Sequence, residues 1–89
     1  MKLSSNKELF DYLLNLSLTL ESRGEEGLSH LVTAASRHAA GMSTEFLGES
    51  RIALREVFAS LRETDTLSQN ERARLLEVLK QLDAAFDRK

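Results

Sequence analysis

The chain contains no proline and only four glycines among its 89 residues. Proline breaks helices and glycine disfavours them, so a chain with so few of both can run in long helices. No segment of useful length alternates apolar and polar residues as a strand does, whereas four segments repeat apolar residues every three or four positions. The sequence therefore predicts an all-α fold.

Capping residues and glycines indicate where these helices begin and end. Ser5 with Glu8, and Ser68 with Glu71, have the spacing of a capping box. Gly24 and Gly41 are suitable stops. The predicted helices cover residues 5–22, 25–40, 43–63 and 68–87, with Ser43 or Thr44 as the N-cap of the third. Because the length suits one domain and the connections are short, we expect a single-domain antiparallel four-helix bundle.

Composition restricts the classes of function. Twelve Lys and Arg against fourteen Asp and Glu give a net charge of −2, without the basic excess of a nucleic-acid binder. The absence of cysteine excludes disulfides and thiolate metal sites. No apolar run is long enough for a transmembrane helix, and the first ten residues lack the apolar core of a signal peptide. We therefore expect a cytoplasmic protein that binds no membrane and for which the charge balance disfavours nucleic-acid binding.

The first predicted helix carries more apolar surface than one buried face needs. One stripe consists of Leu9, Leu13, Leu16 and Leu20. Phe10, Leu14 and Leu18 extend the apolar arc over more than half of the circumference. Such a helix is either buried centrally or covered by another chain, and the sequence leaves both alternatives open.

The third predicted helix has an unusual outward side. Ile52 lies roughly opposite the centre of its apolar face, with Gly48 and Ala59 nearby. This strip is flanked by two sets of like charges. The acidic row is Glu45, Glu49, Glu56 and Glu63, and the basic row is Arg51, Arg55 and Arg62. No acid of this helix has a base three or four residues away, so the rows resemble the flanks of a helix–helix contact. The alternative is that one exposed isoleucine needs no explanation.

Residues that could carry chemistry do not form a motif. His30 and His38 lie eight residues apart on different sides of one helix, without the further ligands that a metal site needs. Ser36 and Ser50 lie near apolar faces, where each hydroxyl is expected to bond a backbone carbonyl one turn back. Glu71 and Arg74 are spaced for an ion pair within the last helix. The sequence predicts no cofactor, no metal and no enzymatic activity.

Three functional hypotheses follow from these surfaces. The leading one is a protein–protein interaction module that self-associates, for example as a homodimer, or binds a partner helix. The second is an inhibitor of the immunity-protein or antitoxin type, whose acidic row faces a basic partner. The third hypothesis is DNA binding through the third helix. It is the weakest, because that helix opens with Glu45 and Glu49, which phosphates would repel.

Overall fold

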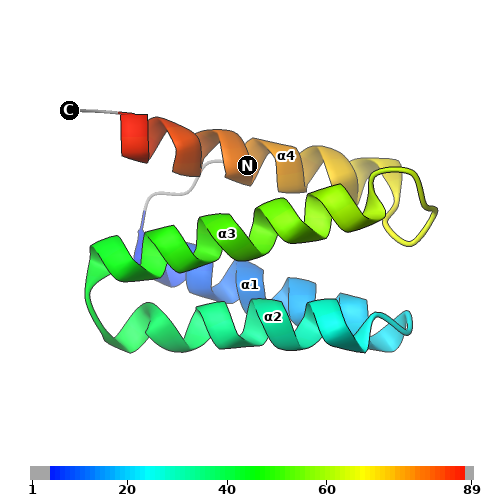
Figure 1. The fold of residues 1–89 in the computed structure, drawn as a ribbon, viewed down its shortest axis with the longest axis horizontal. Helices are drawn as coiled ribbons and strands as arrows, with labels where there is room; N and C mark the ends of the chain where they lie inside the picture. Colours follow the sequence, from blue (N-terminus) through cyan, green and yellow to red (C-terminus); the bar gives the residue numbers. More distant parts are fainter. Residues whose placement is uncertain (1–4, 88–89) are drawn as a thin grey trace.

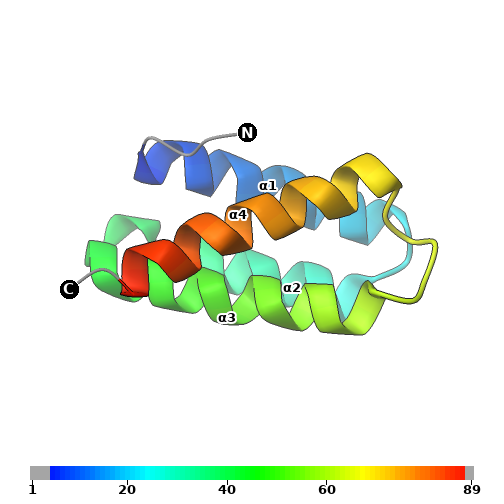
Figure 2. The ribbon, with the colours of Figure 1, turned by 90° about the horizontal axis from the view of Figure 1, so that it is seen from above.

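The computed structural model describes residues 5–87 and confirms a helical bundle. The elements are α1 (Asn6–Ser22), α2 (Glu26–Ser36), the 3-10 helix η1 (Arg37–Ala40), α3 (Ser43–Leu61) and α4 (Gln69–Asp87). The described residues form no strand. In Figure 1 the chain reverses direction at each connection, so that helices consecutive in sequence lie side by side. Viewed from above, α1 and α3 lie at opposite edges of the bundle (Figure 2).

The capping signals in the sequence are confirmed at two of the helix starts. The Ser5 hydroxyl accepts a hydrogen bond from the Glu8 backbone N–H at 3.3 Å, before α1. Before α4, Ser68 and Glu71 bond reciprocally, at 3.1 and 2.8 Å. Gly24 ends the first helix with a φ of 85°, which glycine adopts without strain.

The helix α3 begins at Ser43 as predicted, but the predicted N-cap residue is wrong. The N-cap is Met42, in an extended conformation and without a side-chain cap bond, and Ser43 is already helical. The Ser43 hydroxyl instead accepts a hydrogen bond from the Asn6 side chain, at 2.9 Å. A contact between the starts of α1 and α3 has therefore replaced a local cap, which sequence spacing alone does not reveal.

Two helix ends differ in detail from the predicted bounds. The helix predicted over residues 25–40 is an α-helix only as far as Ser36 and continues as the 3-10 helix η1 to Ala40. The last turn is tightened by i to i+3 bonds, and the Gly41 N–H then bonds the His38 carbonyl. The third helix ends at Leu61, where the Thr64 N–H and hydroxyl both bond the Leu61 carbonyl. Arg62 and Glu63 therefore lie in the turn that follows α3.

The core is built from the apolar faces that the helical period predicts. On α1 the stripe Leu9, Leu13, Leu16 and Leu20 is buried. It packs with side chains of the other helices, among them Val32, Phe46, Leu54, Val57, Leu75, Val78 and Leu82. A hydrogen bond between two buried serines links α2 to α1. The Ser29 hydroxyl donates it to the backbone carbonyl of Ser17, at 2.8 Å. This cross-helix bond requires a close approach of the two backbones, which small residues permit.

One buried serine departs from the expectation. The Ser36 hydroxyl bonds the Thr33 carbonyl at 2.6 Å, as predicted. Ser50 is fully buried, yet its hydroxyl has no hydrogen-bond partner among the described residues, so its predicted bond to the preceding turn is wrong. An unpaired buried hydroxyl costs free energy, because it has lost water without gaining a partner.

We expect Ser50→Ala to raise the free energy of unfolding by about 1 kcal/mol, since it removes an unsatisfied polar atom at nearly constant volume. Ser29→Ala is the matched control, because Ser29 is equally buried but hydrogen-bonded. That control should lower the free energy of unfolding by about 1 kcal/mol. Urea denaturation measures both changes, and equal losses in the two variants would contradict this account of Ser50.

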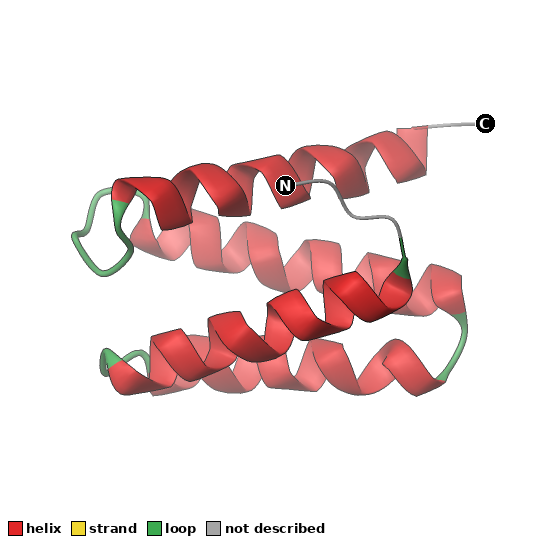
Figure 3. Ribbon diagram, turned by 180° about the vertical axis from the view of Figure 1, so that it is seen from behind, coloured by secondary structure: helices red, strands yellow, loops and turns green. Residues whose placement is uncertain are grey.

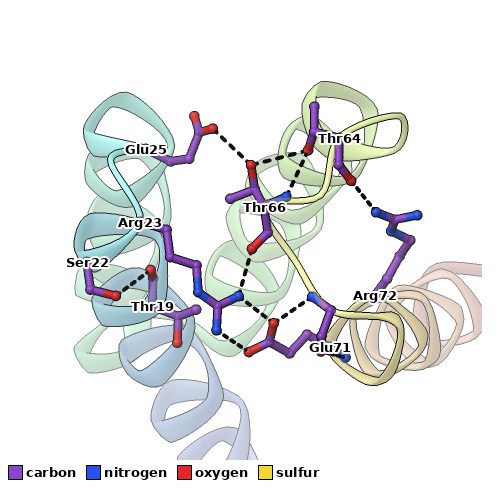
Figure 4. A network of polar contacts seen from close by, with 9 residues as sticks. Thr19, Ser22, Arg23, Glu25, Thr64, Thr66, Glu71 and Arg72 are labelled. Atoms are coloured by element: carbon purple, nitrogen blue, oxygen red, sulfur yellow. Dashed lines mark hydrogen bonds and ion pairs between the residues drawn. The ribbon is translucent and has the colours of Figure 1, made fainter.

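A group of polar contacts connects the α1–α2 turn to the α3–α4 turn at one end of the bundle (Figure 4). The Arg23 guanidinium forms a bidentate ion pair with Glu71 and also donates to the Thr66 carbonyl, at 2.7 Å. Arg72 donates to the Thr64 carbonyl. Glu71 thus pairs with Arg23 on another element, and not with Arg74 of its own helix as its spacing predicted.

These contacts change the acidity of Glu71. The hydrogen bonds from the Arg23 side chain and the Ser68 backbone lower the pKa of Glu71 to about 2. In the unfolded chain the carboxyl group titrates near its ordinary pKa of 4.5. Its contribution to stability is therefore complete above pH 4.5 and is lost as the pH falls towards 2.

We expect Glu71→Gln to lower the free energy of unfolding at pH 7 by about 1 kcal/mol. The value is kept small because the side chain is 35% exposed and its ion pair is screened by water. Glutamine can still cap α4, so the loss reports the charge. The difference from the wild type should shrink as the pH is lowered from 5 to about 2, the folded pKa of Glu71. Urea denaturation across this range measures it, with Glu77→Gln as the control on the exposed side of α4. If the difference in unfolding free energy between the two proteins does not change with pH, the charge of Glu71 does not stabilise the fold.

Candidate interaction surfaces

The outward face of α3 presents Ile52 to solvent. This side chain is 61% exposed, and Ala59 and the acidic Glu49 and Glu56 beside it are exposed as well. Opposite them, the buried face of α3 consists of Phe46, Ser50, Ala53, Leu54, Val57 and Leu61. Helical phase therefore placed Ile52 correctly outside the core.

The basic row of this face is engaged by α4, which the sequence did not indicate. One carboxylate oxygen of Asp83 lies 3.4 Å from Arg51 Nε and 3.0 Å from an Arg55 guanidinium nitrogen. The Arg51 guanidinium also lies 4.6 Å from the centre of the Phe86 ring, in cation–π contact. The two arginines therefore connect α3 to α4, so this basic row lies beside a helix–helix contact within the chain.

Gly48 is likewise turned towards α4. A Cβ atom at this position would lie 3.5 Å from the end of the Phe86 ring. The small, apolar strip predicted along Gly48, Ile52 and Ala59 is therefore interrupted at Gly48, because Phe86 partly covers it. Ile52 and Ala59 remain as the exposed apolar part.

The acidic row remains largely without basic partners. Glu45 forms an ion pair with His38 of η1, with 2.8 Å between Oε1 and Nδ1. Within residues 5–87, Glu49, Glu56 and Glu63 form no ion pair, nor does Arg62 in the turn after α3. The outward face of α3, defined as Glu45, Glu49, Ile52, Glu56 and Ala59 together with Glu63, therefore presents mainly negative charge.

The second predicted surface lies on the far side of the bundle. Phe10 is half-buried against the core, while Leu14 and Leu18 are 36% and 64% exposed. Helix α1 is therefore not buried on all sides, and its apolar excess faces solvent. These leucines belong to α1 and Ile52 to α3, two helices that lie at opposite edges of the bundle in Figure 2.

A groove between α1 and α4 was not predicted. It encloses about 390 Å³ and is lined mainly by Tyr12, Leu16, Leu67, Glu71 and Arg74. Burial raises the pKa of the Tyr12 phenol well above its usual value, against the opposing effect of Arg74. The rim carries both signs of charge, and Glu71 on it is already bound to Arg23. The groove therefore favours no particular class of ligand.

Neither a metal site, a membrane-spanning helix nor a comparison with known proteins indicates a function. Among residues 5–87 no group of three or more His, Cys, Asp or Glu could hold a metal ion. In the same part of the chain, no helix has the length and apolar character needed to cross a membrane. No protein-family model, no curated protein and no solved structure matches the chain.

We expect Gly48→Ala to raise the free energy of unfolding by about 1 kcal/mol, because alanine favours a helix interior and 3.5 Å is an ordinary contact distance to Phe86. Gly27→Ala, where nothing lies near the added methyl group, is the control for helix propensity alone. Thermal and urea unfolding measure both variants. A loss of stability at Gly48 combined with a gain at Gly27 would contradict the described packing of Phe86.

Proposed function

We propose that this protein is a non-enzymatic interaction module that binds a basic protein through the outward face of α3. The observation that carries the proposal is the imbalance between the two charged rows. Arg51 and Arg55 both pair with Asp83, whose single negative charge offsets one of their two positive charges. Glu49, Glu56 and Glu63 have no ion-pair partner among the described residues, and in the basic row only Arg62 lacks one. A partner with lysines or arginines would supply the missing charge.

The spacing of this row suits a helix as the binding element. Glu49 and Glu56 are seven residues apart, as are Ile52 and Ala59, so both pairs recur at the heptad period of helices that pack lengthwise. Ile52 supplies the one large apolar side chain on the face. A partner helix would place an apolar residue against Ile52 and basic residues beside the glutamates, with the charges accelerating encounter.

Self-association through this same face is less favourable. In an antiparallel two-fold pair of α3 helices, each acidic row would lie beside the acidic row of the other copy. A parallel pair would place acids beside arginines, but Arg51 and Arg55 are already occupied by Asp83. Contact with DNA phosphates is also unfavourable, because Arg51 and Arg55 are paired with Asp83 and the exposed glutamates would repel phosphates.

A more specific form of the proposal is an inhibitor of the immunity-protein or antitoxin type. The acidic row on α3 favours it, since proteins that act on nucleic acids carry basic surfaces that such a row could cover. The cysteine-free chain suits the reducing cytoplasm, which we propose as its location.

The test compares two variants with the same loss of negative charge. The first carries Glu49→Gln, Glu56→Gln and Glu63→Gln on the outward face of α3. The control carries Glu26→Gln, Asp65→Asn and Glu77→Gln, at exposed positions elsewhere. Each immobilised protein is incubated with extract of the source cells at 50 mM NaCl, and retained proteins are identified and then eluted with rising salt.

We expect the wild type and the control to retain the same basic protein and to release it as salt screens the contact. The first variant should bind it at least tenfold more weakly when the purified pair is titrated by calorimetry. The proposal would be refuted if all three forms retained that protein equally well. It would also be refuted if only proteins without a basic surface were retained.

A further inference from the structure

The outward face of α1 has a symmetric pattern about Leu14. Phe10 precedes Leu14 by four residues and Leu18 follows it by four. Lys7 precedes it by seven and Glu21 follows it by seven. At 100° per residue all five side chains fall within roughly 40° of one direction, so they share one face of the helix. The pattern is apolar in the middle and oppositely charged at its two ends.

This symmetry matters because a two-fold contact uses the same patch on both subunits. If residue i of one copy touches residue j of the other, then j also touches i. In an antiparallel pair of α1 helices centred on Leu14, Phe10 would lie beside Leu18 of the other copy. Lys7 would lie opposite Glu21 of the other copy, about 10 Å from the centre along the axis. A parallel pair would instead place lysine near lysine and glutamate near glutamate.

The structure leaves this face accessible. Leu18 is among the most exposed large apolar residues of the described chain, at 64%, and Leu14 is partly exposed. In Figure 3, where α1 is the helix that follows the N-terminal trace, no described element lies in front of it. Glu21 forms no ion pair among the described residues, and the ion pair of Lys7 is with the exposed Asp11, at 3.1 Å. Such surface pairs contribute little, so Lys7 can exchange its partner at small cost.

We propose that a second copy of this chain covers the outward face of α1 in an antiparallel, two-fold symmetric contact centred on Leu14. This inference does not rest on the proposed function of α3, since the two faces lie at opposite edges of the bundle. One helix pair buries less than the roughly 1,200–2,000 Å² of stable complexes, so the dimer is weak. It presents two acidic faces outward, and a partner with two basic sites would bind it more tightly by avidity.

Sedimentation equilibrium over about 10 μM to 1 mM tests the contact, a range chosen because a small interface gives micromolar to millimolar affinity. We expect the wild type to approach the dimer mass at the highest concentration. Leu18→Glu should weaken association at least tenfold, because it places two carboxylates in the apolar centre. Ile52→Glu, equally exposed but on α3, is the matched control and should not change it.

Charge reversal decides the orientation. Lys7→Glu and Glu21→Lys should each weaken the dimer severalfold, because each brings like charges together across the two-fold axis. The double variant Lys7→Glu/Glu21→Lys restores opposite charges in the antiparallel pair and should recover the wild-type constant within about twofold. Circular dichroism of every variant verifies that the helices remain folded.

Each remaining outcome would overturn the inference. A wild type that stays monomeric at 1 mM would show that no second copy binds this face, which would then be free for a different chain. A dimer that Leu18→Glu leaves intact would be formed elsewhere. Two single charge variants that weaken the dimer without recovery in the double variant would exclude the antiparallel arrangement. None of these outcomes affects the test of α3, which uses other residues and another readout.

Discussion

A helix in a four-helix bundle can bury only one face, and this constraint decides which side chains of the protein meet solvent. On α1 the buried face is filled by Leu9, Leu13, Leu16 and Leu20, and no room remains inside for Leu14 and Leu18. On α3 the buried face includes Leu54 and leaves Ile52 outside. The two apolar excesses lie at opposite edges of the bundle, so they can serve two different contacts.

The packing of α4 against α3 determines the charge of the second surface. Asp83 and Phe86 of α4 reach Arg51 and Arg55 and draw this basic row towards the interhelical contact. Without α4, the four glutamates of the acidic row would lie beside three arginines, none of them paired with Asp83. With α4 in place, the glutamates dominate, and this is why we propose a basic partner for α3 but a second copy for α1.

The faces of the helices and the two capping boxes could be predicted from the sequence, whereas contacts between helices could not. The 100° period correctly placed the core stripe of α1 and the exposed Ile52, and the S-x-x-E spacing correctly placed the caps at Ser5 and Ser68. The ion pairs of Arg51 and Arg23 depend on residues more than 30 positions away, which no local spacing reveals. The unpaired Ser50 hydroxyl and the 3-10 end after α2 were likewise not indicated by any local spacing.

We propose that copies of the chain meet through α1 and leave α3 free for another protein. Backbone amide chemical shifts, followed by NMR while the protein is diluted from about 1 mM to 20 μM, test this claim most directly, because a weak dimer dissociates over that range. The account predicts concentration-dependent shifts along the outward side of α1, near Leu14, Leu18 and Glu21, with the α3 amides near Ile52 unchanged. Shifts centred on Ile52, or no shifts at all, would contradict it.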